Sequence, residues 1–171
     1  ITPQFLPSTN FSAVKLAVNP SNANTVWVLS GSDRLFKGIK ELWRSTDYGL
    51  TWTRKNTASQ HAIDFALHPT LPNVILMTTS TIGPSGGDDD KGAVYSSVDG
   101  GGSWSQVTLP GMTNNATGAV WFDGADAYVI NVQADACGSP PERSGKFKGT
   151  TTDSWVTSSW TKVDDGVAPD E

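Results

Sequence analysis

The sequence predicts an all-β protein built from three four-stranded repeats, and three observations lead to this prediction. The pattern S-x-D-x-G-x-[ST]-W occurs at 45–52 and 97–104, and an eroded copy runs from Thr151 to Trp160. The aspartates of these copies recur at intervals of about 50 residues, a period typical of units that each form one β-propeller blade. The chain also contains 17 glycines, 10 prolines and seven tryptophans, which favours turns and short strands. The predicted class is therefore β-propeller-type, with about three four-stranded blades per chain.

Length and charge limit the partners that the chain can have. Its 171 residues suit one domain, 1–171, with 12 basic and 17 acidic residues and a net charge of −5. This balance opposes a nucleic-acid partner, whose phosphates need a basic surface. No apolar run approaches the roughly 18 residues that span a membrane, so no membrane partner is expected. The single Cys137 excludes an internal disulfide framework. Since zinc-ligand spacing, a phosphate loop and a Ser/His/Asp pattern are all missing, no metal and no cofactor are expected.

The repeated motif has the chemistry of a hairpin turn. An aspartate side chain accepts hydrogen bonds from backbone N–H groups just ahead of it and so stabilises a tight turn. The glycine two residues later supplies a positive φ without a steric penalty. The tryptophan then opens the outgoing strand, where its ring can pack beneath the turn. The structural residues predicted on this basis are Asp47, Gly49, Trp52, Asp99, Gly101, Trp104, Asp153 and Trp160.

This motif resembles the Asp-box, or BNR repeat, of sialidases, xyloglucan-degrading propeller hydrolases and sortilin-type receptors. The resemblance implies that each box is a structural turn on the rim of a blade, away from the ligand. The segments 18–22 and 67–73 also resemble the D-P-x-x-P-N turn of the xyloglucan hydrolases, with Asn19 and His68 where those turns hold Asp. Sialidase activity would need an arginine cluster with an R-I-P-like motif upstream of the first box, and the sequence has none there.

Each strand of the three repeats, 12–56, 61–109 and 117–164, follows from local pattern. Val14, Leu16 and Val18 alternate with other residues, as in a strand with one buried face. The near-continuous apolar runs 25–29 and 74–77 predict strands buried on both faces. Pro20 and Pro69 mark turns after the first strands. The predicted strands are 13–18, 25–29, 41–45 and 51–54 in the first repeat, 62–67, 74–77, 93–97 and 103–107 in the second, and 119–122, 127–132, 146–150 and 160–163 in the third.

Three blades leave a propeller open. Propellers close with about four to eight blades, and exposed apolar blade faces are a liability for a monomer. The chain is therefore expected to be part of a longer propeller, or a homo-oligomer in which two copies supply six blades. An irregular three-unit β-structure is the remaining interpretation.

Long connections between the second and third strands are the predicted ligand-binding elements. The loops 30–40, 79–92 and 133–145 would lie on the rim opposite the Asp-boxes, and loops of this length are often functional. The candidate ligand-binding residues in them are Arg34, Asp88, Asp89, Asp90 and Arg143. The acidic run also has the alternative interpretations of a solvated loop tip and of a calcium site, although the ligand spacing of an EF-hand is missing.

Asp64 is the candidate catalytic residue, because it interrupts an apolar first strand. First strands line the channel of a propeller, and the resemblance implies that related hydrolases keep catalytic carboxylates there. Simple alternation gives the alternative: Ile63, Phe65 and Leu67 face one way and Asp64 faces channel water. His68 corresponds to Asn19 in the turn and is predicted to be structural.

The sequence leaves three functions open. The favoured hypothesis is a secreted module that binds carbohydrate through its loops and through aromatics among Trp27, Trp43, Trp121 and Trp155. The alternatives are a glycoside hydrolase, or a fragment of one, acting on a β-glucan, and a sortilin-like protein-binding scaffold. Secretion is expected because the chain opens at Ile1 without a methionine and carries N-glycosylation sequons at Asn10 and Asn115.

Overall fold

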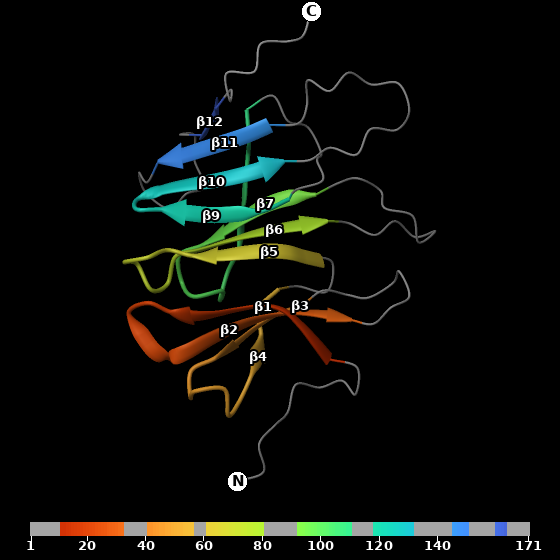
Figure 1. The fold of residues 1–171 in the computed structure, drawn as a ribbon, viewed down its shortest axis with the longest axis vertical. Coiled ribbons are helices and arrows are strands. Elements are labelled where there is room, and N and C mark those ends of the chain that lie inside the picture. The colour runs from red at the N-terminus through yellow and green to blue at the C-terminus, as the bar shows by residue number, and fades with distance from the viewer. Residues whose placement is uncertain are drawn as a thin grey trace, which may run out of the picture.

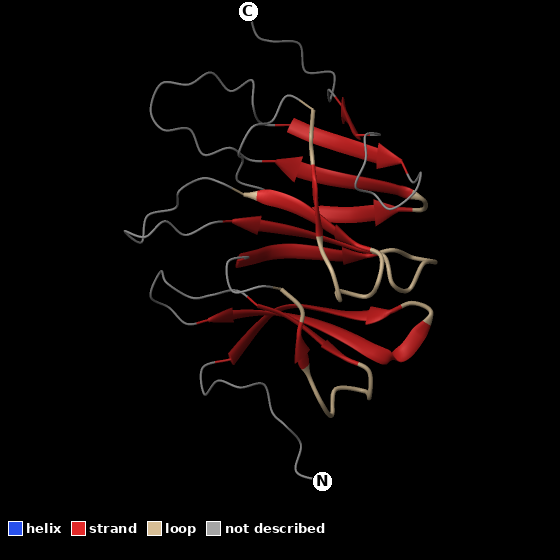
Figure 2. Cartoon of the chain, turned by 180° about the vertical axis from the view of Figure 1, so that it is seen from behind, coloured by secondary structure: helices blue, strands red, loops and turns tan. Residues whose placement is uncertain are grey.

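A computed structural model describes residues 11–32, 41–56, 61–80, 92–110, 118–131, 145–150 and 160–163. These residues form twelve strands in three four-stranded antiparallel sheets, in the orders β1-β2-β3-β4, β5-β6-β7-β8 and β9-β10-β11-β12. We call these sheets blades 1, 2 and 3. They are stacked along the long axis of the molecule, and the same stacking is seen from behind (Figures 1 and 2). The predicted all-β class with three four-stranded blades is confirmed.

Each strand pairs with its neighbour in the chain, so every blade is an antiparallel meander. Blade 1 contains β1 (Phe11–Asn19), β2 (Asn22–Ser32), β3 (Glu41–Ser45) and β4 (Thr53–Arg54). Blade 2 contains β5 (His61–Leu67), β6 (Ile75–Ser80), β7 (Ala93–Ser97) and β8 (Ser105–Val107). Blade 3 contains β9 (Val120–Asp123), β10 (Asp126–Asn131), β11 (Gly145–Thr150) and β12 (Trp160–Val163).

The core lies between the blades. Trp27, Leu29 and Leu42 of blade 1 pack against Ile75 and Met77 of blade 2. The next residue along β6, Leu76, packs instead into a second cluster with Val120, Val129 and Phe147 of blade 3. Successive side chains of a strand point to opposite faces, so β6 buries both of its faces, as its continuous apolar run predicts.

The two complete Asp-box turns have equivalent hydrogen bonds. Asp47 accepts hydrogen bonds from the backbone N–H and the hydroxyl of Thr51, at 2.8 and 2.5 Å. Asp99 accepts the same pair from Ser103, at 2.9 and 2.7 Å. The strands β4 and β8 begin one residue after the tryptophans, not at them. The third box, with Asp153, lies outside the described residues apart from Trp160, which begins β12 and is buried.

The tryptophans of the two boxes form different bonds. The indole N–H of Trp52 donates to the carbonyl of Gly49 at 3.0 Å, within its own turn. The indole N–H of Trp104 donates instead to the carbonyl of Lys55 at 2.7 Å and so joins blade 2 to blade 1. Arg44 adds a second link, from Nη1 to the carbonyl of Gly100 at 2.9 Å. The boxes therefore stabilise the contact between blades as well as the turns themselves.

Two of the tryptophans expected to contact ligand belong to the interior. Trp27 is fully buried between blades 1 and 2, and Trp43 is also buried. Their proposed role in sugar contact is wrong, because both strands bury the face on which these rings lie. Trp121 is half-buried, and Trp155 lies outside the described residues.

Candidate functional site

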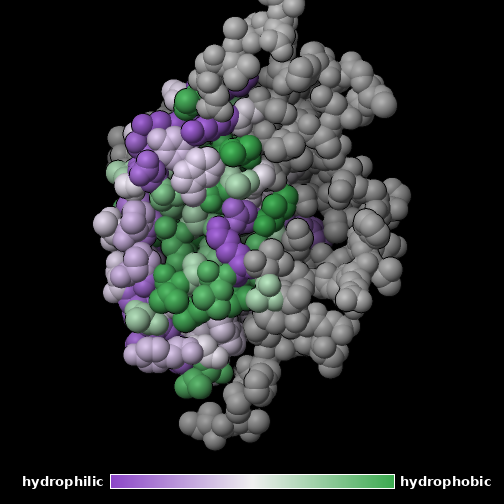
Figure 3. Space-filling view, viewed as in Figure 1, coloured by the Kyte–Doolittle hydropathy of each residue, from purple (hydrophilic) through white to green (hydrophobic). Residues whose placement is uncertain are grey.

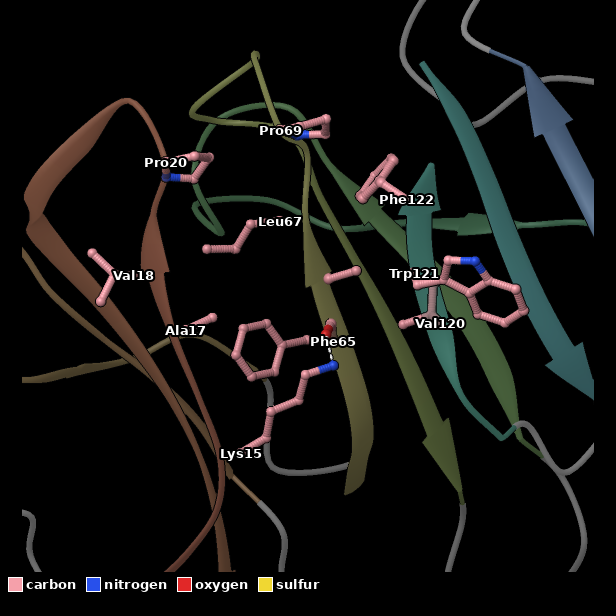
Figure 4. A pocket seen from close by; sticks show the side chains of 11 residues that line it. Lys15, Ala17, Val18, Pro20, Phe65, Leu67, Pro69, Val120, Trp121 and Phe122 are labelled. Carbon is pink, nitrogen blue, oxygen red and sulfur yellow. Dashed lines mark hydrogen bonds between the residues drawn. The ribbon is translucent and has the colours of Figure 1, made fainter. Parts of the chain in front are cut away.

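A pocket with a volume of about 380 Å³ lies over the first strands of all three blades. Its walls are almost entirely apolar and include three aromatic rings, and its one charged residue is Lys15 (Figure 4). The space-filling view shows a hydrophobic area on this face, with hydrophilic residues at its centre (Figure 3). The lining residues are Lys15, Ala17, Val18, Pro20, Phe65, Ala66, Leu67, Pro69, Val120, Trp121 and Phe122.

Equivalent β-bulges set the direction of the side chains at the base of this pocket. The pairing of β1 with β2 shifts between Ala13 and Lys15, and the pairing of β5 with β6 shifts between Ala62 and Asp64. A bulge redirects the side chains next to it. Lys15 and Asp64, which occupy corresponding positions in the two repeats, meet between blades 1 and 2.

Asp64 connects all three blades. Its Oδ1 accepts hydrogen bonds from Lys15 Nζ at 2.7 Å and from the backbone N–H of Phe65 at 2.8 Å. Its Oδ2 accepts from the backbone N–H of Val120 on β9 at 3.0 Å. Lys15 Nζ also donates to the carbonyl of Phe65 at 2.6 Å. Both carboxylate oxygens are thus engaged with protein donors, an arrangement suited to holding first strands at a fixed separation.

Asn19 and His68 cap the two turns at the rim of the pocket. They stand where the D-P-x-x-P-N turns of the xyloglucan hydrolases hold Asp. Asn19 Oδ1 accepts from the backbone N–H of Ser21 at 2.9 Å. His68 Nδ1 accepts from the backbone N–H groups of Thr70 and Leu71, at 3.2 and 3.1 Å. Because Nδ1 is an acceptor, the neutral ring carries its proton on Nε2. Burial lowers the pKa of His68, and its ring packs edge-on against Phe122 at 4.9 Å.

The pocket lies toward the Asp-box edge of the blades. It includes Pro20 and Pro69 of the turns that follow β1 and β5. The boxes adjoin these turns, since Tyr48 N–H donates to the carbonyl of Asn24 and Gly100 N–H to that of Asn73. The sequence instead predicts a ligand at the edge of the blades opposite the Asp-boxes. The residues predicted to bind it there, Arg34, Asp88, Asp89, Asp90 and Arg143, lie outside the described residues, as do the sequons at Asn10 and Asn115.

The sequence predicts Asp64 as a site residue but does not predict its ion-pair partner, Lys15. Lys15 stands four residues before Asn19 just as Asp64 stands four before His68. Opposite charges at equivalent positions of adjacent repeats are a signal that could have paired them. Among the residues that the structure describes, no group of three His, Cys, Asp or Glu side chains is arranged to hold a metal ion. The same residues include no helix long and apolar enough to cross a membrane.

Solved structures with a similar fold include two GH74 enzymes and YCF48. The GH74 enzyme of Niastella koreensis is 19% identical with a TM-score of 0.60, over 92% of this chain and 24% of that one. The GH74 xyloglucanase of Xanthomonas campestris is 17% identical with a TM-score of 0.58, over 86% of this chain and 22% of that one. A structure of YCF48 bound to D1 peptide is 15% identical with a TM-score of 0.55, over 92% of this chain and 40% of that one.

The chain spans about a quarter of the length of these GH74 enzymes, and the low identities make the likeness one of fold. No curated protein sequence matches the chain significantly. The sequence profile of the Sortilin-Vps10 family, described as "Sortilin, neurotensin receptor 3", matches residues 40–169. That match covers well over half of the chain, and together with the three antiparallel blades and the boxes at Asp47 and Asp99 it shows that the chain belongs to the Sortilin-Vps10 family of Asp-box β-propellers.

Proposed function

We propose that the chain is a secreted carbohydrate-binding part of an Asp-box propeller, and that the sugar binds in the pocket over β1, β5 and β9. The observation that carries this proposal is the lining itself. A volume of 380 Å³ falls within the usual range of small-ligand sites, about 300–1,000 Å³. The half-buried ring of Phe122 offers an apolar surface for the C–H face of a sugar, next to the apolar side chain of Leu67.

The charged group that the described pocket residues offer to the sugar hydroxyls is Lys15. It lies at the pocket wall with its side chain 39% exposed, and its ammonium group donates to Asp64 and to the carbonyl of Phe65. The fold shared with a xyloglucanase supports a β-glucan-like ligand.

Calorimetric titration with neutral xyloglucan oligosaccharides tests the proposal. Leu67 lines the pocket, whereas Leu71 is an exposed leucine of the neighbouring turn that does not line it. We expect Leu67→Asn to weaken binding about tenfold through loss of apolar contact, and Leu71→Asn to leave binding within about twofold. Equal effects of the two substitutions, or no binding by the parent chain, would overturn the proposal. Thermal melting of each variant separates lost binding from lost folding.

Peptide binding is the second candidate. Ten of the eleven residues that line the pocket are apolar, and one lysine stands at its wall, a chemistry that suits an apolar side chain next to a carboxylate. Membership of a family described by a neurotensin receptor, and the peptide in the YCF48 complex, support it. Binding of peptides but of no sugar in the same titration would favour this function.

Glycoside hydrolysis is the third candidate, with Asp64 and a loop acid as the pair of carboxylates that the reaction needs. Release of reducing sugar from a β-glucan, abolished in Asp64→Asn while the variant stays folded, would establish it. The three hydrogen bonds that Asp64 accepts from within the protein favour a positioning role over a catalytic one.

A further inference from the structure

We infer that the outer face of blade 3 is a second ligand site, which takes an acidic sugar such as a uronic acid. The site adjoins the pocket, with which it shares Trp121, and rests on the proposed function only for the class of ligand. It is formed by residues of β9, β10 and β11 that point away from blade 2. These residues include Trp121, Asp123, Asp126, Tyr128, Ile130, Lys146 and Lys148.

This face differs in chemistry from the faces that join the blades. Both contacts between blades are built on apolar clusters, which include Ile75 and Met77 on one side of β6 and Leu76 on the other. The alternate residues of blade 3, such as Val129 and Phe147, contribute to the second cluster. The outer face instead carries four charged side chains, Asp123, Asp126, Lys146 and Lys148. It is therefore unlike a surface made to be covered by another apolar blade.

Two aromatic rings form the centre of the face. Trp121 and Tyr128 are directly opposite each other on β9 and β10, and their rings stack with a centroid distance of 5.2 Å and an interplanar angle of 11°. Both residues are half-buried, and Ile130 next to them is 39% exposed. Because the two rings stack on each other, the apolar surface left for the C–H face of a pyranose is the outer side of the stacked pair together with Ile130.

The two lysines near the rings differ in their ion pairing. Lys148 Nζ lies 2.7 Å from Asp126 Oδ2, and the hydrogen bond that Lys148 donates to Asp126 raises the pKa of Lys148. Lys146 Nζ lies 5.2 Å from the Tyr128 ring centroid and 5.8 Å from that of Trp121. Among the residues that the structure describes, Lys146 has no carboxylate within ion-pair distance. Within the described part of the chain, the ammonium group of Lys146 near the rings thus has no carboxylate partner, and an anionic ligand would supply one.

A uronic acid meets both requirements of this face, an apolar sugar ring for the aromatic pair and an anionic group for Lys146. Its ring can lie on the aromatic pair while the carboxylate accepts a hydrogen bond from Lys146. A neutral sugar would satisfy only the first requirement. The two lysines of this face stand with two aspartates, Asp123 and Asp126, so the attraction for an acidic ligand is local to Lys146, which lies at the opposite end of β10 from both acids.

Titration with oligogalacturonate, and with its methyl ester as the neutral counterpart, tests the inference. We expect the acid to bind and the ester to bind about tenfold more weakly, with binding of the acid reduced by added salt. Lys146→Gln should lower the affinity for the acid about tenfold, and Tyr128→Ala should do the same. Lys148→Gln is the matched control and should change the affinity less than about twofold, because its charge is already paired with Asp126.

Equal binding of acid and ester would overturn the inference, as would equal losses in Lys146→Gln and Lys148→Gln. Capture of an acidic peptide at Lys146 without binding of the uronate would also overturn it. The neutral xyloglucan titration reports on the pocket through Leu67→Asn, because Leu67 lines the pocket and is not part of this face. Failure there with retained uronate binding would remove the pocket proposal alone, and the reverse result would remove this inference alone.

Discussion

Glycine at position 101 shows how one residue supports both a turn and a contact between blades. Its backbone has φ +78°, a left-handed conformation that residues with a Cβ atom rarely adopt. A Cβ atom there would lie 3.0 Å from Cη2 of Trp27 and 3.2 Å from Cβ of Lys55, both in blade 1. The Asp-box therefore needs glycine here for backbone freedom and for space.

Gly101→Ala should destabilise the protein by about 3 kcal/mol, from backbone strain and from overpacking against Trp27. Gly124, with φ +59° and no atom within 4 Å of its would-be Cβ, isolates the strain. Gly124→Ala should cost about 1 kcal/mol. Urea denaturation of the two variants measures both values, and equal losses would contradict the role of Gly101 in the contact between blades.

His68 should make stability depend on pH. Its pKa in the folded state lies below the usual value of 6.5, so as the pH falls below about 6.5 the unfolded chain takes up a proton that the folded chain does not. The free energy of unfolding should therefore decrease as the pH falls below this value. His68→Asn should keep the turn, because Asn19 caps the equivalent turn in blade 1, and should remove this part of the pH dependence.

The difference between the denaturation curves of the parent chain and His68→Asn, recorded from about pH 8 to pH 5, isolates this contribution. A difference that does not change with pH would show that His68 takes up its proton equally in both states.

At the scale of the element, the Asp-box turns should be sensitive to acid. Hydrogen bonds from Thr51 and Ser45 lower the pKa of Asp47 from 3.8 to about 2, and those from Ser103 and Ser97 lower the pKa of Asp99 further. A depressed carboxyl pKa contributes stability above the unfolded value of 3.8, and this is lost as the pH falls through the folded values.

The double variant Asp47→Asn/Asp99→Asn should therefore melt at a lower temperature at pH 7 and show a flatter decline between about pH 4 and pH 2. Thermal melting monitored by circular dichroism over this range provides the measurement. A parallel decline in parent and variant would mean that other carboxylates govern the acid transition.

The sequence predicts these elements well where their causes are local. The Asp-box turns depend on side chains that hydrogen-bond to backbone groups within four residues, and β6 depends on a run of apolar residues. Both can therefore be predicted from the sequence. The bulges before Lys15 and Asp64 are not, because they arise from pairing with β2 and β6. The second bond of the box, from Trp104 to Lys55, needs knowledge of how blades are packed.

The candidate site was predictable only in part. The position of Asp64 on a first strand is visible in the sequence, whereas the pocket depends on three strands that are distant in the chain. Trp27 and Trp43 look like Trp121 in sequence, and only the packing of the blades separates the buried rings from the half-exposed one.

At the scale of the whole molecule, Asp64 should matter for how the blades are held together. Asp64→Ala would leave the N–H of Val120 without its acceptor and Lys15 with the carbonyl of Phe65 but no counter-charge, and we expect a loss of about 3 kcal/mol in the free energy of unfolding. Asp126→Ala removes a Lys–Asp pair of the same 2.7 Å length that lies within blade 3, and its effect should be much smaller.

Urea denaturation of both variants gives the comparison. Similar free energies of unfolding for Asp64→Ala and Asp126→Ala would contradict a bridging role of Asp64 and would favour the catalytic hypothesis for this residue.

The first strand of blade 1 exposes apolar side chains. Among the described residues, Leu16 and Val18 are 62% and 49% exposed. Association of copies, or further blades from a longer chain, would cover them. The mass in solution by light scattering distinguishes a single copy from an assembly.

The most direct test of the account is an NMR titration of the ¹⁵N-labelled chain with a neutral xyloglucan oligosaccharide. The pocket proposal predicts amide shift changes that cluster at residues 15–18, 65–67 and 120–122, on the first strands of the three blades. Shift changes that centre on the Asp-box turns at 45–52 and 97–104, or no shift changes at all, would contradict it.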